Sequence, residues 1–153
     1  MADQKFEVQK PTSMDLIAEY IHALTHADFV AMQALRSESF ELDWVHADAF
    51  ADAPLTHAQA NQFWPVWFAA FSEMDYEVTR TIAAEQVVVV QWVFRGTHAA
   101  PLAPPVFDPP LEATGKTIRI RGISVFDIAA DRIQRESMYI DLATLWVELG
   151  VTP

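Results

Sequence analysis

The chain of 153 residues contains no cysteine, and this absence excludes several kinds of chemistry. Without thiols the protein has no disulfide bond, no thiolate nucleophile and no thiolate-bound metal ion. Basic residues are also scarce: 10 Lys and Arg stand against 21 Asp and Glu, which gives a formal net charge of −11. A surface this acidic argues against nucleic acid and against an anionic membrane as binding partners.

Long apolar segments are missing as well. No run approaches the roughly 20 apolar residues of a membrane-spanning helix, and the first residues, MADQKFEVQKPTS, lack the apolar core of a signal peptide. We therefore expect a cytoplasmic protein. The composition, 52% hydrophobic and 20% charged, is that of a folded protein. The length suits one domain over residues 1–153, in which residues 1–11 form a loose leader.

Three helices are predicted in the first half of the chain from their capping residues. Thr12 or Ser13 can cap the first helix, Asp28 the second, and Thr56 the third, where Gln59 completes a capping box. The third helix repeats apolar side chains at helical spacing, namely Ala60, Phe63, Trp64, Trp67, Phe68 and Phe71. Such a stripe either packs against a sheet or lines a pocket for a flat apolar ligand.

Most of the remaining chain is predicted to be strand. Apolar patterns mark strands at residues 39–46, 75–83 and 86–98, and a proline-rich loop at residues 99–113 leads to a final hairpin. Because residues 86–98 are apolar on both faces, they should form a central strand. Helices followed by strands favour an α+β domain with a curved antiparallel sheet.

The hairpin is predicted to turn between Ala129 and Arg132. A two-residue turn would need positive φ at both Ala130 and Asp131, which alanine resists, so a type I turn with Asp131 in the left-handed region is expected. The register that follows makes three cross-strand pairs: Ile128 with Arg132, Arg121 with Tyr139, and Arg119 with Asp141. Beyond the second arm, helical spacing of apolar residues up to Gly150 predicts a short closing helix.

The second arm of the hairpin and the closing helix resemble a known protein family. Their pattern R-I-x-x-E-x-x-x-x-D-L-x-x-L-x-x-x-L-G consists of Arg132, Ile133, Glu136, Asp141, Leu142, Leu145, Leu149 and Gly150. Further matches follow the same order upstream: Trp44-Val45-His46, Phe71-Ser72-Glu73, Gly96-Thr97-His98, Thr114-Gly115-Lys116, Arg121-Gly122 and Phe126. Together they resemble the SnoaL-like polyketide cyclases, within the superfamily of cone-shaped α+β folds named after nuclear transport factor 2.

The resemblance implies a fold with an enclosed apolar pocket. Three N-terminal helices would pack on the concave face of the sheet, and a short helix would close the C-terminus. The aromatic residues expected to line the pocket are Trp44, Phe63, Trp64, Trp67, Trp92, Phe94 and Phe126. The expected ligand is a small apolar or aromatic compound.

The resemblance also implies a chemistry. Cyclases of this kind are similar in using a carboxylate as acid and base, with no metal and no cofactor. The carboxylate deprotonates a carbon between carbonyls, and the ring closes by aldol addition. We expect Asp141 to be this base and Tyr139 to donate a hydrogen bond, while His46 and His98 supply a second proton-transfer or orienting group.

Two of these residues have a structural interpretation too. Asp141 directly precedes a helix, where a carboxylate often caps free N–H groups, and an Arg119 opposite it would lower its pKa and make it a poor base. Tyr139 can simply be a cross-strand partner of Arg121. Three functions therefore stay open: a cofactor-free lyase or isomerase of a polyketide-like carbonyl compound, a non-catalytic small-molecule binding protein, or an epoxide-opening hydrolase. The hydrolase would use Arg119 with Asp141 and Asp127.

The apolar strand at residues 86–98 predicts a homodimer. Val87, Val89 and Val93 lie on one face of this strand, and three helices can cover only one face of the sheet. The other face would leave an extended apolar patch in water, which monomers rarely tolerate. Two-fold pairing through the back of the sheet is the common remedy.

Overall fold

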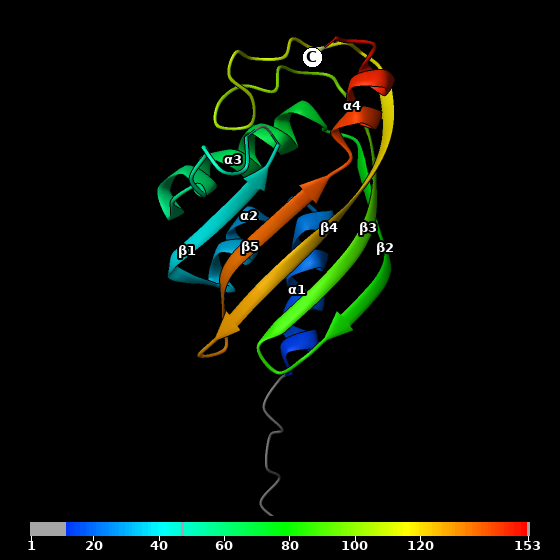
Figure 1. The fold of residues 1–153 in the computed structure, drawn as a ribbon. Coiled ribbons are helices and arrows are strands. Elements are labelled where there is room, and N and C mark those ends of the chain that lie inside the picture. The colour runs from blue at the N-terminus through cyan, green and yellow to red at the C-terminus, as the bar shows by residue number, and fades with distance from the viewer. Residues whose placement is uncertain (1–11, 47, 153) are drawn as a thin grey trace, which may run out of the picture.

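The strands form one five-stranded sheet in the order β1-β5-β4-β3-β2 (Figure 1), in a computed structural model that describes residues 12–46 and 48–152. They are β1 (Arg36–Val45), β2 (Met74–Ala83), β3 (Val87–Thr97), β4 (Thr117–Ala129) and β5 (Arg132–Ile140). β1 runs parallel to β5, and the other neighbouring pairs are antiparallel. The predicted α+β class is confirmed, with a mixed sheet in place of a purely antiparallel one. The predicted leader, residues 1–11, lies outside the described residues.

Helices cover one face of this curved sheet. α1 (Ser13–Thr25), α2 (Phe29–Ala34) and α3 (His57–Ala70) lie against that face, and α4 (Leu142–Leu149) sits at the end where β5 stops (Figure 1). α1 packs on β2 and β3, α2 and α3 pack on β1, and α4 packs on β4. Within the described part of the chain, no helix combines the length and the apolar character that a membrane crossing requires.

The predicted helix ends are confirmed. Thr12 caps α1 and Thr56 caps α3, each within a complete capping box, and the Asp28 carboxylate accepts a hydrogen bond from the N–H of Ala31. Gly150 ends α4 with a left-handed φ of 69°. These ends are set by the hydrogen-bonding needs of a few neighbouring residues, and a sequence shows those neighbours directly.

The core lies between the helices and the inner face of the sheet. Alternate residues of the strands point into it, including Phe40, Leu42, Trp44, Val88, Val90, Trp92, Phe94, Ile118, Ile120, Phe126 and Ile128, all of them buried. β3 is an inner strand with β2 and β4 as neighbours, but the central position belongs to β4. On the outer face, Val89 and Val93 are half-buried and Val87 is 37% exposed.

The proline-rich loop closes one end of the core. Leu102, Val106 and Phe107 are buried, and Leu102 pairs with Leu111 so that the loop folds back on itself. The Val106 carbonyl accepts a hydrogen bond from the indole N–H of Trp44 at 3.0 Å. The loop therefore contributes side chains to the core.

The turn between β4 and β5 differs from the prediction. Ala130 and Asp131 both have positive φ, 49° and 57°, and the two-residue turn pairs Ala129 with Arg132. The predicted type I turn is therefore wrong. A two-residue turn of this kind matches the twist of the long strands on either side, and their pairing outweighs the roughly 1–2 kcal/mol that a left-handed alanine costs.

A β-bulge next to this turn changes the register of the hairpin. Ile128 pairs with Ile133 but Asp127 pairs with Arg135, so β5 has one extra residue, Gln134, at this point. The Gln134 amide donates a hydrogen bond to the carbonyl of Ala129 at 2.9 Å. One extra residue in a strand turns all the following side chains to the opposite face.

All three predicted cross-strand pairs are wrong, because the turn and the bulge each shift the register by one residue. Arg132 pairs with Ala129 and not with Ile128. Tyr139 pairs with Ile123 and not with Arg121. Asp141 stands opposite Arg121 and not Arg119, because its backbone N–H donates to the Arg121 carbonyl at 3.0 Å.

Candidate functional site

Asp141 caps α4. Its carboxylate accepts hydrogen bonds from the backbone N–H of Thr144 at 3.1 Å and from the Thr144 hydroxyl at 2.8 Å, and it lies 3.7 Å from Nε of Arg121. The bonds from Thr144, with a smaller effect of Arg121, hold the pKa of Asp141 below its usual 3.8. The side chain is therefore a stable carboxylate and a weak base, as its structural interpretation anticipated.

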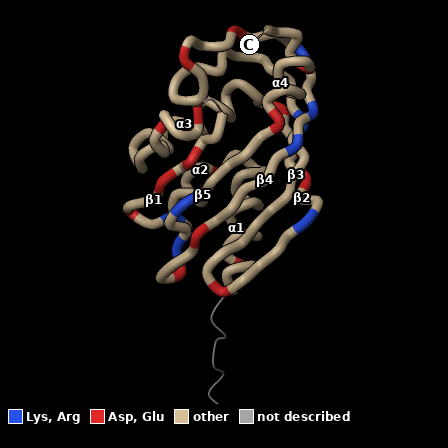
Figure 2. The backbone as a smooth tube through the Cα atoms, viewed as in Figure 1, with Lys and Arg blue, Asp and Glu red and all other residues tan. Residues whose placement is uncertain are grey.

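Tyr139 lies on the outer face of the sheet. Its side chain is 49% exposed, and with Arg121, Ile123 and Asp141 it borders an open depression of about 630 Å³. Figure 2 shows basic residues on β3 and β4, and on these strands Arg95 and Arg119 are cross-strand partners. Tyr139 thus faces away from the helix-covered core.

The two histidines lie apart from Asp141. The His46 Nδ1 bonds to the carbonyl of Trp44 at 2.8 Å, and its ring stacks on Trp44, beside a depression of about 400 Å³ next to the proline-rich loop. His98 is fully buried, and its Nδ1 accepts from the backbone N–H of Thr114 at 3.3 Å. Burial lowers the pKa of His98 and so disfavours its protonated form. The structure does not bring the four predicted catalytic residues together.

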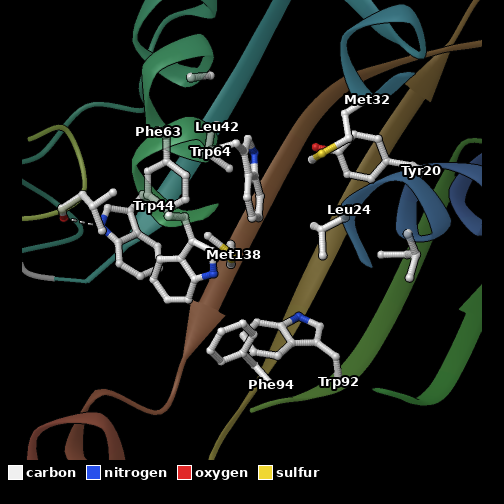
Figure 3. Close-up of a cluster of buried hydrophobic side chains, with 14 of the residues drawn as sticks. Tyr20, Leu24, Met32, Leu42, Trp44, Phe63, Trp64, Trp92, Phe94 and Met138 are labelled. Atoms are coloured by element: carbon white, nitrogen blue, oxygen red, sulfur yellow. Dashed lines mark hydrogen bonds between the residues drawn. The ribbon is translucent and has the colours of Figure 1, made fainter. Parts of the chain in front are cut away.

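The seven predicted pocket residues are all buried. Ring contacts across both layers join five of them, namely Trp44, Phe63, Trp64, Trp67 and Phe94. In Figure 3, Trp44, Phe63 and Trp64 lie together near β1 and α3, while Trp92 and Phe94 approach from β3. Edge-to-face contacts join Trp44 to Phe63 at 5.3 Å between ring centres, and Trp67 to Phe94 at the same separation. These contacts are those expected if the aromatic residues pack against the sheet. A ligand between the rings stays a prediction.

A buried polar cluster at Glu136 was not predicted from the sequence. Glu136 lies on β5, is 1% exposed, and faces the helices. One carboxylate oxygen accepts from the Tyr20 hydroxyl of α1 at 3.2 Å, and the other accepts from the Ser124 hydroxyl of β4 at 3.0 Å. Helix and strands thus converge on one carboxylate inside the core.

The hydrogen-bond directions in this cluster are fixed by its outer members. The indole N–H of Trp92 donates to Ser124 at 3.1 Å, and Nε of Arg36 donates to the Tyr20 oxygen at 3.1 Å. Trp and Arg side chains can only donate, and the Tyr20 oxygen accepts from both Nε and Nη2 of Arg36, so the Tyr20 hydroxyl hydrogen points to Glu136. With the Ser124 hydroxyl donating to its other oxygen, Glu136 accepts on both oxygens, as an ionised carboxylate does.

Burial changes the acidity of the whole cluster. It raises the pKa of Glu136 above its usual 4.5, and the charge of Arg36 and the two hydroxyl donors offset this only in part. Burial also raises the pKa of Tyr20 far above the ordinary phenol range, so its hydroxyl stays protonated. The pKa of Tyr76 rises for the same reason, with a further contribution from the charge of Glu136. The cluster combines a carboxylate of raised basicity with protonated donors.

The bulge at Gln134 explains why Asp141 was favoured over Glu136. Strict alternation from the buried Ile133 would turn Tyr139 and Asp141 inward, whereas the extra residue turns Glu136 and Met138 inward. The sequence does contain a signal for this cluster. Arg36 has the alternation of a residue on the same strand face as the apolar Phe40, Leu42 and Trp44. Ser124 likewise lies on the same strand face as Ile120 and Phe126. A charged or polar residue on a buried face is the informative exception.

The described residues contain no group of three or more His, Asp or Glu side chains that could hold a metal ion. The protein sequence matches the family model of the SnoaL-like polyketide cyclases over residues 15–149. No curated protein matches it.

Several solved structures share the fold. AclR from Streptomyces galilaeus, a candidate hydroxylase, is 17% identical, with 92% of this chain and 96% of that chain covered and a TM-score of 0.75. A candidate SnoaL-like polyketide cyclase from Jannaschia sp. CCS1 is 14% identical, with 95% and 98% covered and a TM-score of 0.75. TsrD from Streptomyces laurentii is 14% identical, with 91% and 95% covered and a TM-score of 0.73.

Proposed function

The chain belongs to the SnoaL-like polyketide cyclase family, and from this premise we propose that it is a cofactor-free acid/base enzyme whose base is Glu136. The substrate is a small apolar carbonyl compound, and the reaction is an intramolecular aldol closure or a related isomerisation. The observation that carries the proposal is the buried Glu136 carboxylate, held by two hydroxyl donors from opposite layers of the fold.

The reaction needs only proton transfers. The Glu136 carboxylate removes a proton from the carbon next to a carbonyl, and the resulting enolate carbon attacks a second carbonyl carbon of the same molecule. The proton then returns from Glu136 to the new alkoxide oxygen, so no co-reactant is consumed. A carboxylate whose pKa is raised by burial is a stronger base than one in water, and positioned groups of this kind accelerate proton transfer.

The chemical partners of Glu136 support this role. The protonated Tyr20 can hydrogen-bond a substrate oxygen when it leaves Glu136, and the apolar shell of Trp92, Phe126 and Met138 excludes water. Because Glu136 is 1% exposed, the substrate reaches it only when the helices move aside. An apolar substrate replaces the aromatic contacts that such an opening breaks.

The epoxide-opening alternative has less support. It would require Arg119, Asp127 and Asp141 around one water molecule, but Asp141 bonds to Thr144 and contacts Arg121. Asp127 lies on the outer face, where it pairs with Val87.

A non-catalytic binding protein is the remaining alternative. The close packing of the aromatic residues and the complete hydrogen bonding of Glu136 favour it, because both could serve stability alone. A test of the proposed function must therefore measure proton transfer and not binding.

Deuterium exchange provides that test. The α-protons of acetonaphthone, an apolar aromatic ketone, exchange slowly in D₂O, and proton NMR follows their loss. The wild-type protein should accelerate this exchange, and Glu136→Gln should reduce the acceleration by about a hundredfold or more.

Asp141→Asn is the matched control, because it changes a carboxylate five residues away that caps α4. It should retain the wild-type rate. An unchanged rate in Glu136→Gln, or a loss only in Asp141→Asn, would assign the base to another residue. No acceleration by the wild-type protein over a panel of such ketones would favour the binding protein.

A further inference from the structure

A guanidinium group is buried under α2 with more hydrogen-bond donors than the fold uses. Arg36 begins β1 and is 4% exposed. Its Cζ lies 4.2 Å from the ring centre of Phe40, 5.3 Å from that of Tyr20 and 5.8 Å from that of Phe29. Ring faces attract a guanidinium, but they do not satisfy its N–H groups.

The hydrogen bonding of Arg36 is incomplete. Nε and Nη2 both donate to the Tyr20 oxygen, whereas Nη1 is buried and has no hydrogen-bond partner among the described residues. The Tyr20 phenol is neutral, because burial raises its pKa far above the usual range. Within the described chain, the guanidinium therefore has no directly bonded anion, and Glu136 is reached only through the Tyr20 hydroxyl. A buried cation in this state favours any anion that replaces the missing partner.

We propose that Nη1 of Arg36 binds the anionic oxygen of the ligand's enolate, which makes Arg36 a further ligand-binding residue beside Glu136. This inference rests on the proposed function, since the enolate is the species that Glu136 would generate. Arg36 and Glu136 both bond to the Tyr20 hydroxyl, so one small molecule can approach both groups. The guanidinium stabilises the enolate oxygen while Glu136 holds the proton.

Phe29 marks the path by which such a ligand would enter. Of the three rings around the guanidinium, Tyr20 and Phe40 are fully buried, and Phe29 of α2 is half-buried. α2 has six residues and one fully buried side chain, Met32. A shift of Phe29 therefore exposes Arg36 at a smaller loss of buried area than a shift of α1 or α3.

The charge of Glu136 should affect how tightly the protein binds an enolate. An enolate bound near an ionised Glu136 is repelled, whereas an enolate near a protonated Glu136 is not. Gln is the isosteric mimic of the protonated form. Glu136→Gln should therefore bind an enolate more tightly than the wild-type protein does, although it has lost the base.

The probes are dimedone, an enolate at neutral pH, and a trimethylcyclohexanone, a neutral ketone of similar size and shape. Affinities come from isothermal titration calorimetry on the full chain. The wild-type protein should prefer dimedone by about tenfold or more, and Glu136→Gln should increase this preference further. Arg36→Met keeps much of the side-chain volume and should abolish the preference for dimedone.

A measurement on the wild-type protein covers the possibility that Arg36→Met does not fold. The side-chain nitrogen and proton resonances of Arg36, followed in ¹⁵N-arginine-labelled protein, should shift when dimedone saturates the protein. An unshifted Arg36 resonance, an equal affinity for both probes, or a preference that survives in Arg36→Met would overturn the inference. If Glu136→Gln leaves deuterium exchange unchanged while the Arg36-dependent preference persists, the enolate site stands and the proposed catalytic function fails.

Discussion

Glu136 and Asp141 lie five residues apart, one on β5 and the other just after it, yet their environments are opposite. Glu136 faces the helices, is 1% exposed, and has its pKa raised by burial. Asp141 lies at the edge of the outer-face depression, and its pKa is lowered by the Thr144 hydrogen bonds at the start of α4. The same functional group is a basic carboxylate in one place and a helix cap in the other.

In this protein the role of a carboxylate depends on which face of the sheet its side chain points to. Side chains alternate along a strand, so residues separated by an odd number face opposite sides. The family resemblance includes both acids, and the sequence pattern does not say which one points inward. The bulged Gln134 makes that choice for the whole second half of β5.

The largest effect is expected when the buried carboxylate of Glu136 is removed. Glu136→Ala removes the acceptor of Tyr20 and Ser124 and leaves the Arg36 charge without compensation. The free energy of unfolding, from urea denaturation, should fall by about 3–5 kcal/mol. Ser124→Ala removes one donor to Glu136 and the acceptor of the Trp92 N–H, and should cost about 1–3 kcal/mol. A loss below about 1 kcal/mol for Glu136→Ala would mean that water already solvates the cluster.

The next effect concerns the outer face, where the homodimer stays a prediction. Val89 is half-buried on this face, and Ile123 and Tyr139 on neighbouring strands are 36% and 49% exposed. Val89→Asp should weaken self-association about a hundredfold or more, close to 2.7 kcal/mol. Sedimentation should show two chains for the wild-type protein, more firmly paired in higher salt because the acidic subunits repel each other.

The control for Val89→Asp is Val30→Asp, which adds the same charge at a position that is 75% exposed on α2. It should leave the dimer intact. A wild-type protein that sediments as a single chain at micromolar concentration would remove the basis for the dimer.

The smallest effect is the pH dependence of the stability that Glu136 and Asp141 each contribute. Because the pKa of Glu136 is raised, its contribution to stability relative to Glu136→Gln is present below about pH 4.5 and is lost as the pH rises through the raised value. Because the pKa of Asp141 is lowered, its contribution relative to Asp141→Asn is present above about pH 3.8 and is lost as the pH falls through the lowered value.

The thermal midpoint of the wild-type protein is therefore compared with that of Glu136→Gln and with that of Asp141→Asn across acidic and neutral pH. The two differences should change with pH in opposite directions, by a few degrees. Parallel changes would mean that the two carboxyl groups share one environment.

Much of the fold could be predicted because its signals are local. The caps at Thr12, Asp28 and Thr56 depend on hydrogen bonds within one turn of helix, and Gly150 ends α4 through its own backbone freedom. The apolar alternation of β3 separated the side chains of its two faces, but it did not say which set faces the helices. The motifs that resemble the SnoaL-like cyclases identified the family for the same reason, since each motif is a short run of residues.

The candidate site could not be predicted in this way, because it depends on register. Glu136, Tyr20 and Arg36 come from β5, α1 and the first residue of β1, and no short window of sequence contains two of these elements together with their orientation. Arg36 was missed because β1 begins three residues before the predicted strand.

The α+β class, the helix ends and the family thus follow from the sequence alone. The tertiary structure alone decided which carboxylate lies in the core. A two-residue turn at Ala130 and one extra residue at Gln134 set the pairing of β4 with β5. That pairing is selected by the total hydrogen bonding and burial of two long strands against the helices, a sum over the whole domain that local propensities do not contain.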